Sequence, residues 1–171
     1  LDKEKQKNSL YILKKNKKYL AKGTYFNANN LIDKLLIDDV KQSNIFINNQ
    51  SIMIDIKKIR LDKDYELDNL SGNLNFKNQN LMNGKLVGNF SSDKRLEFTV
   101  INDGNSKITT LFMDYAKPIV RRYKFIKGFD EGVLDFYSSK TGDKSNSTLK
   151  IYHFKLKELP LLTKILTLAS L

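Results

Sequence analysis

The chain has no cysteine and a single histidine, and these two shortages exclude most covalent chemistry. Without cysteine there are no disulfides, no thiolate metal ligands and no cysteine nucleophile. A serine–histidine–acid triad would need His153, which stands in a predicted strand between Tyr152 and Phe154. Neither a glycine-rich phosphate loop nor a zinc-ligand spacing occurs. We therefore expect no enzymatic activity and no cofactor.

Long apolar runs and arginine are also scarce. No apolar run reaches the roughly 18 residues that cross a bilayer, and no signal-peptide pattern is present. Only four of the 30 basic residues are arginine, namely Arg60, Arg95, Arg121 and Arg122. Guanidinium is the preferred reader of phosphate and guanine, so this shortage argues against a nucleic-acid partner.

The positive charge is unevenly distributed. The net charge is +11, and the joint excess of lysine, asparagine and isoleucine is typical of an AT-rich genome. Residues 1–22 hold eight lysines against Asp2 and Glu4, which places +6 of the net charge there. Such a stretch is usually a solvated face, and in some proteins it contacts anionic lipid. We assign residues 1–28 as a basic N-terminal strand region.

Most of the sequence alternates between apolar and polar residues with a period of two, which predicts strands with one apolar face. Residues 44–48 and 52–56 flank a polar turn and predict a hairpin. The apolar residues then change parity between Ile56 and Ile59, which requires a bulge if one face stays buried. Short turn-rich links predict antiparallel neighbours. The further predicted strands are 72–76, 84–90, 95–100, 107–112, 132–137 and 148–156.

Helical patterns are few. Residues 29–36 place four apolar side chains on one stripe. Residues 114–123 begin with Asp114 as the expected N-cap and carry a proline in the first turn. Residues 160–171 predict a C-terminal helix that is apolar over most of its circumference. The strands thus outnumber the helices that cover them.

This imbalance sets the expected fold class. We predict a mainly β fold, a curved antiparallel meander forming an open groove, with about three short helices including one at the C-terminus. The apolar face of such a sheet needs a cover. The cover is either the sheet itself, rolled into a barrel or folded into a sandwich, or a ligand with long apolar chains.

Four carboxylates lie at a spacing of two in Asp62, Asp64, Glu66 and Asp68. They share one face if 61–68 is extended, and a solvated strand face is the simplest interpretation. A calcium site would require the loop spacing and glycine of calcium-binding motifs, and both are missing. We therefore predict no metal site.

The C-terminal segment from Thr148 to Leu171 resembles a segment of the AsmA-like envelope proteins. In that family a strand runs into a phenylalanine-containing stretch, a proline and a leucine-rich helix, as in HFKLKELPLLTKILTLASL here. Residues 116–123, followed by 129–135, are similar to the family's short helix and glycine-led strand. The family has paired glycines where this chain has Glu131 and Gly132. The resemblance covers residues 70–171.

The resemblance implies a non-enzymatic, periplasmic segment, anchored to the inner membrane through a part of the parent chain outside residues 1–171. It implies an apolar β-groove that binds or conducts phospholipid between the inner and outer membranes and supports outer-membrane integrity. Because the chain begins at Leu1 and ends within an apolar pattern, we expect it to be one fragment of a larger repeated protein. The candidate groove residues are Phe98, Val100, Phe154, Leu156, Leu162, Ile165 and Leu166.

Two other interpretations remain open from the residues alone. The chain is a structural scaffold module of the cell envelope if helices and a second layer close its core. It is a basic nucleic-acid-binding domain if the lysines bind phosphate, although the aromatic residues are not gathered beside basic ones as in single-strand binders. Alternation shows which residues share a face and leaves the concave face undetermined.

Overall fold

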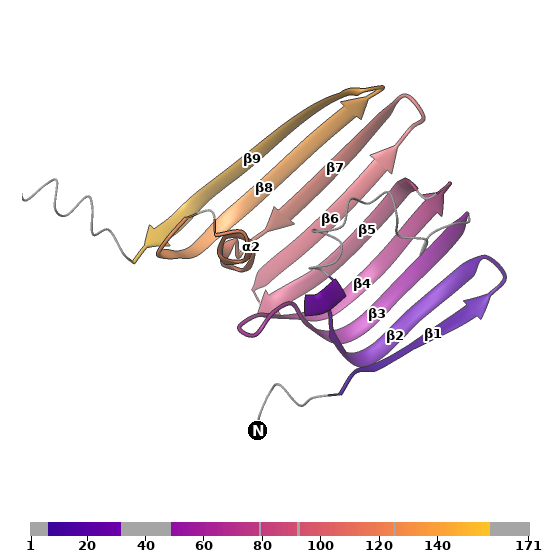
Figure 1. Ribbon diagram of the computed structural model, residues 1–171, viewed down its shortest axis with the longest axis horizontal. Coiled ribbons are helices and arrows are strands. Elements are labelled where there is room, and N and C mark those ends of the chain that lie inside the picture. Colours follow the sequence, from indigo (N-terminus) through magenta and orange to yellow (C-terminus); the bar gives the residue numbers. More distant parts are fainter. Residues whose placement is uncertain (1–6, 32–48, 79, 92, 125, 158–171) are drawn as a thin grey trace, which may run out of the picture.

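The computed structural model describes residues 7–31, 49–78, 80–91, 93–124 and 126–157. These residues form one open sheet of nine strands whose spatial order follows the sequence, with β1 and β9 at its edges (Figure 1). The strands are β1 (Ser9–Lys15), β2 (Lys18–Asn27), β3 (Gln50–Arg60), β4 (Glu66–Lys77), β5 (Asn80–Ser91), β6 (Lys94–Asn102), β7 (Ser106–Met113), β8 (Phe129–Thr141) and β9 (Lys144–Leu156). The mainly β prediction is confirmed.

Tight turns join most neighbouring strands, as their composition predicts. Asn16, Gly104 and Gly142 have positive φ angles of 56°, 95° and 57°, which asparagine and glycine accept more readily than other residues. In the β6–β7 turn, the Asp103 carboxylate accepts hydrogen bonds from the backbone N–H groups of Asn105 and Ser106, both at 2.8 Å. The strands from β3 to β9 pair antiparallel, most of them through such short connections, and β7 and β8 through the longer segment 114–128 that contains α2.

The β2–β3 pair corrects the prediction of an antiparallel meander. β3 runs parallel to β2 and antiparallel to β4, so the sheet is not wholly antiparallel. β3 thus pairs with β2 and β4, and the predicted hairpin partner 44–48 lies outside the described residues. A parallel pair needs a crossover of a dozen residues or more, and residues 28–49 between the two strands supply that length.

The parity change in β3 occurs as predicted. Ile56 and Ile59 are three residues apart, yet both are buried in one cluster with Leu67 and Ala28. Opposite them in β4, Asn69 has a φ of 53°, a left-handed conformation that turns the following residues. The irregularity keeps the apolar residues of β3 and β4 on one face on both sides of it.

A second parity change lies in β8 and β9. Glu131, Gly132 and His153 have φ angles of 60°, 80° and 54°. As a result Phe129 and Leu134, five residues apart, are buried in the same cluster. A Cβ on Gly132 would lie 2.7 Å from the Phe129 ring, so no larger residue fits there without displacement. His153 is exposed at this bend.

The helices differ in part from the prediction. α2 spans Lys117–Arg122 and has Pro118 in its first turn, as expected, but its N-cap is Ala116 rather than Asp114. The Asp114 carboxylate instead accepts a hydrogen bond from the Arg95 backbone N–H at 3.1 Å. Residues 29–31 are also helical. The described residues thus hold two helices rather than three, and the predicted helix 160–171 lies outside them.

Residues 61–68 do not form one extended strand. The Asp62 carboxylate accepts hydrogen bonds from the backbone N–H groups of Asp64 and Tyr65, both at 2.8 Å, and so closes a turn before β4 begins at Glu66. Asp64, Glu66 and Asp68 bind basic side chains of other elements instead of lying free on one face.

Candidate functional site

One face of the sheet is apolar across most of its width, and we call it the apolar face. Strand pairing places a single row of side chains side by side across β3 to β9, because residues paired across strands point to the same side. The row consists of Ile54, Gly72, Leu86, Phe98, Leu111, Phe136 and Leu149. Five of its middle members lie between buried and exposed, and Leu149 on the edge strand is 49% exposed.

The opposite face carries charged and polar residues, many of them paired. The Lys22 ammonium lies 2.8 Å from Asp55, and the Lys85 ammonium lies 2.6 Å from Glu97. The hydrogen bond from Lys85 lowers the pKa of Glu97 below its ordinary value. Such exposed ion pairs are typical of a solvated sheet face. The contrast identifies the apolar face as the side that needs a cover.

α2 covers one end of the apolar face. Val120 is fully buried, and Ala116 joins the cluster formed by Met113 and Leu134. The Ala116 backbone N–H donates to the Gly132 carbonyl at 2.7 Å, which fixes the start of the helix against β8. Ala28 covers the neighbouring β3–β4 part of the same end. Within the described residues, both clusters of buried apolar side chains thus lie at this end, which we call the α2 end, while Val100 is buried farther along β6.

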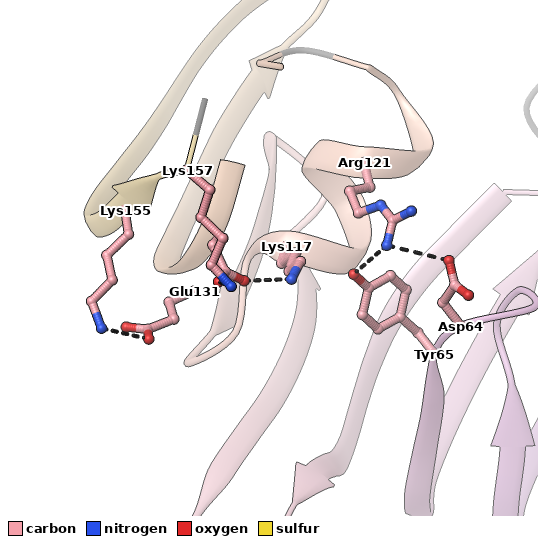
Figure 2. A network of polar contacts seen from close by, with 8 residues as sticks. Asp64, Tyr65, Lys117, Arg121, Glu131, Lys155 and Lys157 are labelled. Atoms are coloured by element: carbon pink, nitrogen blue, oxygen red, sulfur yellow. Dashed lines mark hydrogen bonds and ion pairs between the residues drawn. The ribbon is translucent and has the colours of Figure 1, made fainter. Parts of the chain in front are cut away.

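A buried carboxylate holds the α2 end together (Figure 2). Asp130 is 7% exposed and binds the ammonium groups of both Lys117 on α2 and Lys157 after β9. The hydrogen bonds from Lys117 and then Lys157 hold the pKa of the Asp130 carboxyl well below its usual range. Beside it, Lys155 donates to Glu131 at 2.7 Å. One acidic group thereby connects the helix, β8 and the end of β9.

Two adjacent arginines of α2 bind residues in the segments that follow β2 and β3. Arg121 lies 3.2 Å from Asp64 and also donates to the Tyr65 hydroxyl at 3.2 Å (Figure 2). Arg122 donates to the carbonyls of Leu61 at 2.8 Å and Asn29 at 3.1 Å. The helix therefore contacts segments that are between 56 and 93 residues away in sequence, and these contacts close the α2 end.

An aromatic cluster completes this closure. The Tyr115 ring packs edge-on against Tyr65 and Phe90, with centroids 6.0 and 5.7 Å away. Burial and the neighbouring Tyr65 raise the pKa of Tyr115 to about 12, so its hydroxyl stays protonated at neutral pH. These groups make a structural contact and present no activated nucleophile.

The sequence-predicted groove residues fall into separate places. Phe98 and Val100 both lie on the apolar face of β6, where Val100 is only 2% exposed. Phe154 and Leu156 lie on the edge strand β9, where they are 40% and 36% exposed. Phe154 stacks on Phe129 with ring centroids 5.2 Å apart. Leu162, Ile165 and Leu166 lie outside the described residues.

Sequence reasoning missed most of the row that adjoins Phe98. Leu86, Leu111 and Phe136 all belong to predicted strands, and each has the alternation of a buried face. What was lacking was the register between strands, which sets the row. Within the described ranges, no group of three or more histidine, cysteine or acidic residues is placed to hold a metal ion. No helix among the described residues has the length and apolar content to cross a membrane.

Comparison with known proteins returned no match, whether the chain was compared with protein-family models, with curated proteins or with solved structures.

Proposed function

We propose that this chain is a non-enzymatic segment of a periplasmic, AsmA-like envelope protein, and that its apolar face binds or conducts phospholipid between the inner and outer membranes. One observation carries the proposal. The row from Ile54 to Leu149 crosses seven strands on one face, its middle members are only partly buried, and both described clusters of buried apolar residues lie at the α2 end. The resemblance of residues 70–171 to AsmA-like proteins supports it independently.

The row is about twice as long as one acyl chain, so it has room for the whole chain. Neighbouring strands lie about 4.8 Å apart, so a row across seven strands extends about 29 Å. An acyl chain spans half of a bilayer core of about 30 Å. A chain lying along the row would bury apolar surface on both partners and gain about 25 cal/mol per Å² removed from water. The headgroup would stay in solvent, where it needs no buried partner.

Neighbouring residues of one strand point to opposite faces of the sheet, so lipid contact with the two faces can be compared directly. A photoreactive benzoyl-phenylalanine would be placed at Phe98 or Leu111, which lie on the apolar face, and at Thr99 or Thr110, which pair on the opposite face. We expect irradiation to join phospholipid to the first two positions and not to the other two. The adducts are measured by mass spectrometry of the intact protein.

A scaffold with a closed core would give a different result. In that case none of the four positions would capture lipid, and purified protein would carry no phospholipid and bind little hydrophobic dye. Equal capture at all four positions would also contradict the proposal, because it would show contact without preference for the apolar face.

A further inference from the structure

Lysines gather at the end of the sheet opposite α2, where the β1–β2, β4–β5, β6–β7 and β8–β9 turns lie together, at the upper right in Figure 1. We call this the turn end. Four lysines flank the β1–β2 turn, namely Lys14, Lys15, Lys17 and Lys18. Four more flank the other turns, namely Lys77, Lys107, Lys140 and Lys144. The acids at these turns are Asp103 and Asp143, so eight positive and two negative charges leave +6.

These charges are not neutralised within the described part of the chain. None of the eight lysines takes part in an ion pair there, whereas the described ion pairs involve basic residues elsewhere in the sheet, α2 and the segment after β9. Asp103 is engaged by the backbone of its own turn. Seven of the eight lysines are exposed, and one of these, Lys14, has its ammonium 5.5 Å from the centre of the Tyr19 ring.

One pair of lysines at the turn end destabilises the sheet by charge repulsion. Lys107 of β7 and Lys140 of β8 are direct cross-strand partners. Burial and then the charge of Lys140 lower the pKa of Lys107 below its ordinary value. Like charges directly opposite each other destabilise a sheet. Proteins often give up stability where function requires it, and an anionic partner would relieve this repulsion.

The kind of cation at the turn end favours lipid over nucleic acid. All four arginines lie toward the α2 end and are engaged there, as in the bond from Arg60 to the Asp62 carbonyl at 3.0 Å. The turn end has lysine alone, a point charge on a flexible apolar stem that suits a headgroup layer. Bidentate phosphate reading and base stacking, which nucleic-acid binding uses, would need guanidinium and exposed rings.

Shallow cavities and exposed aliphatic side chains accompany the lysines. A cavity of about 420 Å³ is lined by Lys14, Lys17, the partly buried Tyr19 and four amide side chains of the β1–β2 turn, the start of β3 and the β4–β5 turn. A second, of about 310 Å³, is lined by Lys107 and Lys140 among other residues. Leu13 and Ile101, each close to a turn, are 57% and 56% exposed. Donors and aliphatic groups together match the interfacial layer of a membrane.

We propose that the turn end is a docking surface for an anionic lipid membrane. The lysine ammonium groups contact headgroup phosphates, and Leu13 and Ile101 enter the layer beneath. This inference goes beyond the proposed function, because it does not involve the apolar face, and either can fail while the other stands.

Vesicle co-sedimentation tests the proposal with a pair of charge-matched variants. The purified chain is mixed with vesicles of phosphatidylcholine alone or of phosphatidylcholine and phosphatidylglycerol in equal amounts. The first variant combines Lys15→Gln, Lys17→Gln and Lys18→Gln at the turn end. The second combines Lys57→Gln, Lys63→Gln and Lys124→Gln, exposed lysines that lie away from the turn end. Both lower the net charge by three.

We expect the unaltered chain to bind the anionic vesicles in a salt-sensitive way and to leave neutral ones in solution. Each lysine near an anionic surface contributes about 1 kcal/mol, so the turn-end variant should bind on the order of 100-fold more weakly. The matched variant should bind like the unaltered chain. Replacing the same three turn-end lysines by arginine should preserve binding, because the charge is kept.

Several results would overturn the proposal. Equal losses in the two glutamine variants would show that net charge matters and the turn end does not. Binding to neutral vesicles as strong as to anionic ones would remove the electrostatic basis. Tighter binding to a DNA duplex than to anionic vesicles at the same salt concentration would assign the surface to nucleic acid. Full competition by inorganic phosphate at low millimolar levels would assign it to a small anion.

Discussion

The two ends of the sheet are both rich in basic residues and use them in opposite ways. At the α2 end, Lys117, Arg121 and Lys157 bind carboxylates, and apolar side chains beneath them are buried. At the turn end, lysines flank every turn without a described ion pair, and Lys107 directly opposes Lys140. One end is built to hold the chain together, and the other holds surplus charge at a cost.

The comparison shows why composition alone is a poor guide to partners. A net charge of +11 would be uninformative if it were spread evenly. The fold distributes this charge unevenly. Acids and arginines gather at the α2 end, where segments far apart in the sequence are held together. The charge that remains is concentrated in the short local turns. Mutations at the two ends should therefore affect different properties, stability at one and binding at the other.

The largest effect is expected in the core of the α2 end. Leu134→Ala removes a side chain that is 1% exposed and packs with Met113 and Val120, so the free energy of unfolding should fall by about 2–5 kcal/mol. Leu149→Ala, in an exposed position of the same face, should change stability by about 0.5 kcal/mol or less. Urea unfolding followed by circular dichroism measures both. Similar losses would mean that the apolar face is covered along its whole length.

The next effect separates two neighbouring arginines of α2. Arg122→Ala removes charged hydrogen bonds to the carbonyls of Leu61 and Asn29, which should cost about 1.5–3 kcal/mol. Arg121→Ala removes an exposed ion pair with Asp64 and should cost about 1 kcal/mol or less. The same unfolding measurement compares them. If Arg121→Ala were the more damaging change, the bridge across the α2 end would depend on its surface pair.

Acid should weaken the α2 end through Asp130. Its pKa is lower in the folded chain than the ordinary unfolded value of about 3.9, so its contribution to stability is complete above that value. The contribution is lost as the pH falls through the lower, folded pKa. Asp130→Asn should therefore be less stable than the unaltered chain at neutral pH, and the difference should shrink below about pH 4.

Its neighbour provides the control for this pH dependence. Glu131→Gln breaks only the exposed pair with Lys155, so its stability should follow that of the unaltered chain across the same pH range. Thermal unfolding at a series of pH values measures all three proteins. A constant difference between Asp130→Asn and the unaltered chain down to the lowest pH would show that the carboxylate charge is not what stabilises this end.

Much of the sheet follows from the sequence because its connections are local. From β4 to β9 every connection except the β7–β8 segment that contains α2 is a short turn, and alternation within each strand placed the elements close to where they lie. The parity change between Ile56 and Ile59 was also readable, since only a local irregularity keeps both buried. The parallel β2–β3 pair could not be predicted in this way, because residues 28–49 form a long connection and no local turn determines which strands pair.

The candidate site was less predictable than the fold for a similar reason. The pattern placed Phe98 and Val100 on one face but did not give the register that sets Leu86 and Leu111 beside Phe98. No spacing rule pairs Asp130 with Lys117 and Lys157, which approach it from α2 and from the end of β9. The sequence predicted Asp114 as a helix N-cap, but its carboxylate accepts a hydrogen bond from the backbone at the start of β6 instead.

The smallest effect on stability is the one that separates the two ends most sharply. Lys140→Gln removes the like charge opposite Lys107, so the pKa of Lys107 should rise and the sheet should gain a few tenths of a kcal/mol. The same change should weaken binding to anionic vesicles severalfold, because one ammonium group is lost from the turn end. A variant that is more stable and binds less would show that the turn end trades stability for an anionic partner. If stability and binding fell together, the lysine would be holding the fold rather than meeting a membrane.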